Sequence, residues 1–155
     1  MKAYLGIDPG QRGGLAVVVE SGELREHIPM PKTRKGVLAE IAILDAKYKR
    51  LVVGVEKAQS MPKQGVVSVA NYMREYGVII GLVMGLGLPY HEIPPAMWKR
   101  ELFKGQAEKK GKHVAIVLAE NLFPDIMLTP GLCRNPQDGI AEAALIAEYC
   151  RRLNF

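Results

Sequence analysis

Three strand patterns open the chain, and only short turns separate them. Apolar residues alternate over 2–8, so that Ala3, Leu5 and Ile7 share one face. Residues 15–19 are all apolar, and residues 24–30 alternate again before prolines end the pattern. Strands joined by short turns pair antiparallel. The chain therefore begins with three antiparallel strands, and its fold is built on a sheet.

Helical and strand patterns alternate in the rest of the chain. A strand that follows a helix returns to the sheet by a parallel crossover. We therefore expect an α/β fold, a five-stranded mixed sheet flanked by helices on both faces, in a single domain over residues 1–155. The predicted elements after the third strand are helix 33–49, strand 51–56, helix 65–85, strand 88–93, helix 108–122 and helix 136–153.

The helix predicted over 65–85 is almost entirely apolar, with Arg74 and Glu75 as its only charges. This pattern is typical of a buried or interface helix. It offers more apolar surface than one face of a sheet should absorb, so we expect part of it to pack against a second copy in a homodimer. The residues expected in that contact are Val66, Val69, Tyr72, Met73, Tyr76, Ile80 and Met84.

Composition and charge indicate the cellular location of the protein and the kind of partner that it binds. Twenty-one Lys and Arg residues against 16 Asp and Glu give a net charge of +5, which favours a polyanionic partner. Cys133 and Cys150 lack metal-ligand spacing and suit a reduced, cytoplasmic location. The longest apolar run, residues 78–88, is short of the roughly 20 residues that span a bilayer. A strand pattern starts at once, so we expect neither a signal peptide nor a membrane partner.

Asp8 and Glu56 each stand at the carboxyl end of an apolar strand. Neighbouring strands lie about 4.7–4.9 Å apart, so two parallel strands would bring these carboxylates together. Paired carboxylates repel unless a cation lies between them or one is protonated. A single strand-end acid usually just begins a polar loop, but the pair favours a site for a divalent cation.

Asp138 and Glu142 form a second acidic pair. They lie four positions apart and share a helix face with the apolar Leu145 and Tyr149. An acid near a helix start also stabilises the helix dipole, which is an alternative explanation for Asp138. Acids on an apolar face are unfavourable unless a metal or hydrogen bonds compensate. Metal binding and helix capping both remain open on these residues alone.

Three motifs in this order resemble the RuvC family of Holliday-junction resolvases. They are Gly6-Ile7-Asp8-Pro9-Gly10, Val53-Gly54-Val55-Glu56 and the stretch from Asp138 to Ala147. The compact length is most similar to that of the bacteriophage-type members. The resemblance implies an RNase H-like fold and a homodimer that cleaves four-way DNA junctions, and other branched DNA, in the cytoplasm of a bacterial host.

The resemblance also implies which residues form the active site. It assigns metal binding and catalysis to Asp8, Glu56, Asp138 and Glu142, which would hold two Mg²⁺ or Mn²⁺ ions. Asp8 would bridge the two ions, with Glu56 completing one site and Asp138 and Glu142 supplying the other. Glu142 departs from the pattern, because many members have aspartate there. No nucleotide cofactor is expected, since an actin-like phosphate loop at Gly6–Gly10 would need a second, similar domain.

Basic residues are expected to contact DNA. Those at positions where the family keeps lysines, or in the loop after Glu56, are Lys57, Lys63, Lys99, Lys109, Lys110 and Lys112. Met61 is either an apolar wedge between bases or a residue packed under its loop. Trp98 is predicted to pack in the core.

Two other functions remain within the same fold. One is a RuvC-like nuclease that processes structured RNA, which would not need the long apolar helix. The other is a non-catalytic protein that binds junctions, which would not need four acidic residues.

Overall fold

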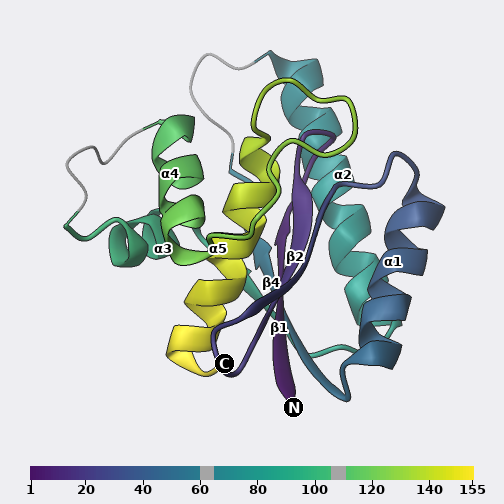
Figure 1. Ribbon diagram of the computed structural model, residues 1–155. Helices are drawn as coiled ribbons and strands as arrows, with labels where there is room; N and C mark the ends of the chain where they lie inside the picture. The colour runs from purple at the N-terminus through teal and green to yellow at the C-terminus, as the bar shows by residue number, and fades with distance from the viewer. Residues whose placement is uncertain (60–64, 106–110) are drawn as a thin grey trace.

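The computed structural model describes residues 1–59, 65–105 and 111–155 of the chain. They form a five-stranded sheet in the order β3-β2-β1-β4-β5, flanked by helices (Figure 1). The elements are β1 (Lys2–Asp8), β2 (Gly14–Val19), β3 (Leu24–Pro29), α1 (Arg34–Lys47), β4 (Arg50–Glu56), α2 (Val66–Gly85), β5 (Tyr90–Ile93), α3 (Pro95–Leu102), α4 (Lys112–Leu122) and α5 (Asp138–Leu153).

The mixed sheet predicted from the sequence is confirmed. β1 is the central strand, antiparallel to β2 and parallel to β4, and β5 continues the sheet in parallel beside β4. All six residues of β2 and five of the seven residues of β1 are buried. Strands covered on both faces read as near-continuous apolar runs, which is why the β2 segment showed no polar alternation.

Helices cover both faces of the sheet, also as predicted. In Figure 1, α1 and α2 lie on one side, and α3, α4 and α5 lie on the other. On the first side the core contains Ile41, Ile79 and Val83 against apolar residues of the strands. On the second side it contains Trp98, Leu118 and Leu145. These two groups of buried side chains hold the helices against the sheet, and these helices carry residues of the candidate site.

Helix α3 was not predicted from the sequence. The Pro94-Pro95 pair was interpreted as the end of a strand, and no element was assigned to the residues that follow it. In the structure Pro95 is the first residue of α3 and Trp98 and Leu102 are its buried residues. Proline is favoured at the first helical position because that residue donates no intrahelical bond, and this signal could have predicted the helix.

Helix α2 is less buried than expected. The structure describes all of it, and Ile79 and Val83 are its buried residues. By length and composition alone α2 could also cross a membrane, with a mean hydropathy of 1.2, whereas the sequence pattern drew attention only to an 11-residue run. One such helix is weak evidence for a membrane. α2 is therefore not a buried core helix, and most of its apolar surface is not covered by the rest of the described chain.

Candidate active site

Three carboxylates converge at the carboxyl end of the central strands. Asp8 ends β1, Glu56 ends the neighbouring parallel strand β4, and Glu142 lies on the second turn of α5. One carboxylate oxygen from each lies within 4.8 Å of the other two. The strand register explains the first pair, because β1 and β4 run in parallel up to Ile7 and Val55. The position of the third acid, Glu142, depends on how α5 packs on the sheet.

Close contact between α5 and the sheet places Glu142 at Asp8. A side-chain carbon on Gly6 would lie only 2.0 Å from the Ala143 carbonyl oxygen. One on Gly139 would lie 2.0 Å from the Arg12 carbonyl oxygen in the turn after β1. Only glycine permits the backbones to approach this closely. These two glycines therefore hold the acidic turn of α5 against the end of β1.

Burial and neighbouring acids raise the pKa of Asp8 and of Glu56. Burial, followed by the charges of Glu142, Glu56 and Asp138, raises the pKa of Asp8 well above its ordinary value. Burial and Glu142 also raise the pKa of Glu56, against the opposing effects of Trp98 and Lys99. Like charges held together in a buried place favour protonation or a bound cation. At neutral pH the arrangement is therefore electrostatically strained without one.

Two neighbouring residues of α3 contact two of these acids. The Trp98 indole Nε1–H donates a hydrogen bond of 2.7 Å to Glu56 Oε2. Lys99 Nζ forms an ion pair with Glu142 Oε1 at 3.1 Å. The sequence placed Trp98 in the core, and it is fully buried there. Its hydrogen bond to Glu56 was missed, because the helix that carries it was not predicted.

The acidic group fits a divalent metal ion. Its ligands are all carboxylate oxygens, the donors that Mg²⁺, Mn²⁺ and Ca²⁺ prefer. Asp138 stands outside this group of three, one helical turn before Glu142, and lines the same cleft. The sequence predicted that Asp8 bridges two ions, with Glu56 completing one site and Asp138 and Glu142 supplying the other. The structure places Glu142 close to both Asp8 and Glu56.

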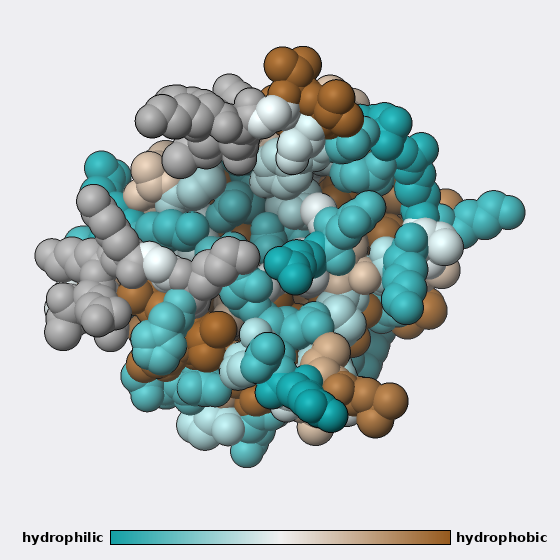
Figure 2. Space-filling model, turned by 90° about the horizontal axis from the view of Figure 1, so that it is seen from above, coloured by the Kyte–Doolittle hydropathy of each residue, from teal (hydrophilic) through white to brown (hydrophobic). Residues whose placement is uncertain are grey.

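A cleft of about 1130 Å³ opens over the acids. Its wall includes Lys57 and Lys99, two of the expected DNA contacts, and Arg12, which the sequence pattern did not single out. Figure 2 shows this end of the molecule, where hydrophilic surface surrounds a hollow. Lys112 begins α4. The other expected contacts, Met61, Lys63, Lys109 and Lys110, lie outside the described residues.

Tyr72 of α2, which was expected in the dimer contact, lines this cleft. It lines the cleft together with Val69, and its ring would lie 3.7 Å from a side-chain carbon on Gly10. Burial, followed by the charges of Glu56, Asp8 and Glu142, raises the pKa of its phenol. The amino-terminal half of α2 is therefore a wall of the candidate site.

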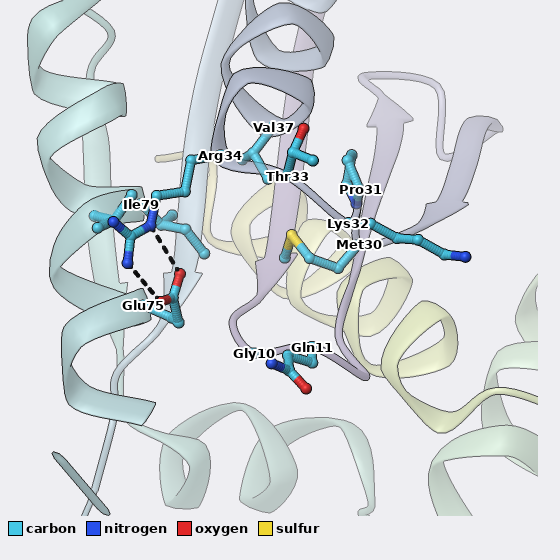
Figure 3. Close-up of a pocket in the computed structure, with 11 residues that line it drawn as sticks. Gly10, Gln11, Met30, Pro31, Lys32, Thr33, Arg34, Val37, Glu75 and Ile79 are labelled. Carbon is cyan, nitrogen blue, oxygen red and sulfur yellow. Dashed lines mark hydrogen bonds and ion pairs between the residues drawn. The ribbon is translucent and has the colours of Figure 1, made fainter. Parts of the chain in front are cut away.

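A second, smaller pocket of about 410 Å³ lies beside the cleft (Figure 3). Gly10, Gln11 and Glu75 line both. Arg34 of α1 reaches across to Glu75 of α2, with Nη2 2.8 Å from Oε1. The Lys32 side chain points away from the pocket in Figure 3. The ion pair joins α1 to α2 next to the candidate site.

The sheet order, the two helical layers and the acids at the ends of β1 and β4 define an RNase H-like fold of the RuvC type. No protein-family model and no curated protein sequence matches this chain.

Similarity to solved structures extends over nearly the whole chain. RuvC of T. thermophilus in complex with a Holliday junction substrate is 19% identical, with a TM-score of 0.65 over 99% of this chain and 97% of that chain. A second Thermus thermophilus RuvC structure is 17% identical, with a TM-score of 0.61 over 98% and 96%. The yeast mitochondrial Holliday junction resolvase Ydc2 is 15% identical, with a TM-score of 0.58 over 96% and 77%. The fold expected from the three motifs is confirmed.

Proposed function

We propose that this protein is a metal-dependent endonuclease that cleaves four-way DNA junctions and other branched DNA. The observation that supports this most strongly is the convergence of Asp8, Glu56 and Glu142 within 4.8 Å in a cleft that Arg12, Lys57 and Lys99 also line. The chain has the fold of RuvC over 99% of its length, and one of the similar structures was solved with a Holliday junction substrate.

Asp8, Glu56 and Glu142 would hold the metal, with Asp138 beside them, and we propose two ions of Mg²⁺ or Mn²⁺. Bound divalent cations supply an activated water and stabilise the leaving oxygen of a phosphodiester. Lys99 keeps its side chain 38% exposed while it contacts Glu142, so its ammonium group is accessible from the cleft. It is placed to neutralise negative charge on the scissile phosphate.

Besides Lys99, the basic residues that line the cleft are Arg12 and Lys57. Both are exposed and line the same wall as the acids. Cationic side chains around a carboxylate floor keep a phosphate backbone near the metal site despite the acids' negative charge. Binding through such contacts releases counterions, so affinity for DNA should fall steeply as salt is raised.

A second copy of this chain is the proposed partner of α2. A four-way junction has two-fold symmetry and needs two matched cuts, which suits a dimer with two-fold symmetry. Six of the exposed residues of α2 recur at alternating spacings of three and four, the pattern of a helix–helix seam. They are Val67, Ala70, Arg74, Gly77, Gly81 and Met84.

This seam differs from the contact expected from the sequence. Tyr72 and Val69 line the cleft, and Tyr76 and Ile80 pack toward the sheet on their own chain. A side-chain carbon added at Gly77 or Gly81 would meet no atom of the rest of the described chain within 4 Å, so the backbone there is open to a close partner. Small residues at this spacing allow two helices to approach closely.

The test of the proposed activity uses three synthetic substrates: a four-way DNA junction, a linear duplex of the same sequence and an RNA hairpin. We expect cleavage of the junction in Mg²⁺ and none in EDTA. Asp8→Asn should bind the junction without cutting it, because it loses one metal ligand and one negative charge. Asp125→Asn, which changes an exposed acid outside the cleft, is the matched control and should cut normally.

Each contrary result has a distinct meaning. Cleavage of the RNA hairpin alone would support the RNA-processing alternative. Tight junction binding with no cleavage in any divalent metal would support a non-catalytic binding protein. Wild-type cleavage by Asp8→Asn would refute the nuclease site. A monomeric mass by light scattering at micromolar concentration, or binding of the protein to lipid vesicles through α2, would refute the dimer.

A further inference from the structure

Trp98 contacts the acidic site in two ways. The edge of its indole ring donates the Nε1–H to Glu56 Oε2 at 2.7 Å. The face of the same ring lies under Lys99, whose Nζ is 4.9 Å from the ring centroid. Lys99 in turn contacts Glu142 at 3.1 Å. One side chain therefore connects, directly or through its neighbour, to two of the three acids.

These contacts join elements that are far apart in the sequence. Glu56 ends β4, Glu142 lies on α5, and Trp98 lies on α3 between them. The relative position of the two acids thus depends on a third element that supplies neither.

The tryptophan itself is held firmly. Trp98 is 0% exposed and packs in the core with Leu102 and Leu118. Phe103 meets its ring edge-on, with centroids 5.7 Å apart and an interplanar angle of 83°. A ring fixed on several sides holds its Nε1–H in one direction. An indole nitrogen can only donate, so the Oε2 that it contacts is kept as an acceptor.

We propose that Trp98 is a positioning residue of the acidic site: its N–H fixes the rotation of the Glu56 carboxylate, and its ring face places Lys99 against Glu142. This role rests on the proposed metal-dependent function. Hydrogen bonds from residues behind the ligands orient metal ligands in general, and their loss typically weakens metal affinity by about 10–100-fold. The same hydrogen bond in an ordinary core tryptophan would affect stability alone.

The first experiment separates the N–H from the packing. Trp98→Phe keeps an aromatic ring in the core and beneath Lys99 but removes the donor to Glu56. Mg²⁺ binding is measured by calorimetry on the DNA-free protein. We expect Trp98→Phe to bind Mg²⁺ at least about tenfold more weakly than the wild type. Leu102→Ala is the control, because Leu102 lies on the same helix in the same core without contacting an acid.

The second experiment uses the wild-type side chain as a reporter. Trp98 is the only tryptophan in the sequence, so tryptophan fluorescence reports on the surroundings of this one indole. Mg²⁺ is diamagnetic and colourless, and it does not itself quench fluorescence. We expect Mg²⁺ to change the emission of Trp98 with the same midpoint as the calorimetric titration. Glu56→Gln should abolish that change.

The outcomes distinguish this role from the proposed function. If Trp98→Phe binds Mg²⁺ as the wild type does, or weakens binding no more than Leu102→Ala, the positioning role is refuted while the nuclease assignment stands. Wild-type emission that stays constant while calorimetry detects Mg²⁺ also refutes it. If the wild type binds no divalent cation, the proposed function fails and this role fails with it.

Discussion

Replacing Asp8 with asparagine should stabilise the metal-free protein while removing its response to Mg²⁺. Asp8 is surrounded by Glu142, Glu56 and Asp138, and burial together with these charges raises its pKa well above the ordinary value. The unfolded chain has no such repulsion. An ionised Asp8 therefore destabilises the fold in the absence of a cation, and a neutral side chain of the same shape does not.

The magnitude follows from the distances between the acids. Two unit charges 4.8 Å apart, the limit within which these carboxylate oxygens lie, repel by about 3.5 kcal/mol at an effective dielectric constant of about 20. Partial protonation of Asp8 and the nearby charge of Lys99 offset part of this repulsion. A net gain of about 2 kcal/mol is expected, which corresponds to about 4–8 °C in Tm for a chain of this length.

The assay is thermal unfolding at fixed protein concentration, in EDTA and in Mg²⁺. In EDTA at pH 7, Asp8→Asn should unfold at a higher temperature than the wild type, and Asp125→Asn should not. In Mg²⁺ at about 100 times its dissociation constant, the wild type should gain about 2.7 kcal/mol and Asp8→Asn little. A lower Tm for Asp8→Asn in EDTA would refute the reasoning.

The sign of the pH dependence gives a further check on the same variant. The pKa of Asp8 is raised in the folded state, so its destabilising effect is absent below the unfolded pKa of about 3.9. It grows as the pH rises and is complete above the folded pKa. The advantage of Asp8→Asn in EDTA should therefore vanish near pH 4. An advantage that is constant with pH would point to a cause other than charge.

Three other variants or conditions test separate features. Protons compete with metal for Asp8, so Mg²⁺ affinity should fall as the pH drops through the raised pKa of Asp8. Calorimetric affinity that stays constant from neutral pH down to the ordinary pKa of an aspartate would contradict this. Gly81→Glu should give a monomer by light scattering with an unchanged circular dichroism spectrum, whereas the same charge at exposed Ala46 should leave the dimer intact. Glu148 accepts hydrogen bonds from Arg151 and Arg152, so Glu148→Gln should lower the free energy of unfolding by about 1–3 kcal/mol at pH 7, and an unchanged denaturant midpoint would contradict this.

The sheet and most helices could be predicted because each has a local pattern. The continuous apolar run of β2 and the alternation of β1 depend only on neighbouring residues. The pairing of Asp8 with Glu56 followed from the rule that a helix between strands makes them parallel. Helix α3 was missed because its eight residues carry one turn of apolar pattern and begin at a proline.

The acidic group could not be predicted from local spacing alone. Spacing shows only that Glu142 and Asp138 are neighbours on one helix, and the expectation that they meet Asp8 rested on the order of the elements and on the family resemblance. The structure brings Glu142 to Asp8 and Glu56 because α5 packs closely on β1, and that contact joins residues more than 130 positions apart. The side of α2 on which Tyr72 acts could not be predicted from local spacing either. Periodicity marked it as apolar surface, but only the angle of α2 to the sheet decides whether that surface faces a partner or the cleft.

The contact between Gly6 and Ala143 has a consequence for how this site can change over evolution. The spacing between Asp8 and Glu142 is set by a residue with no side chain, two positions from the nearest acid. One added methyl group at Gly6 would push α5 outward and separate the acids, although every acid and every base of the cleft would be unchanged. A descendant of this protein could therefore lose its metal site while keeping all of its ligands. Inspection of the acidic positions alone would not reveal that loss.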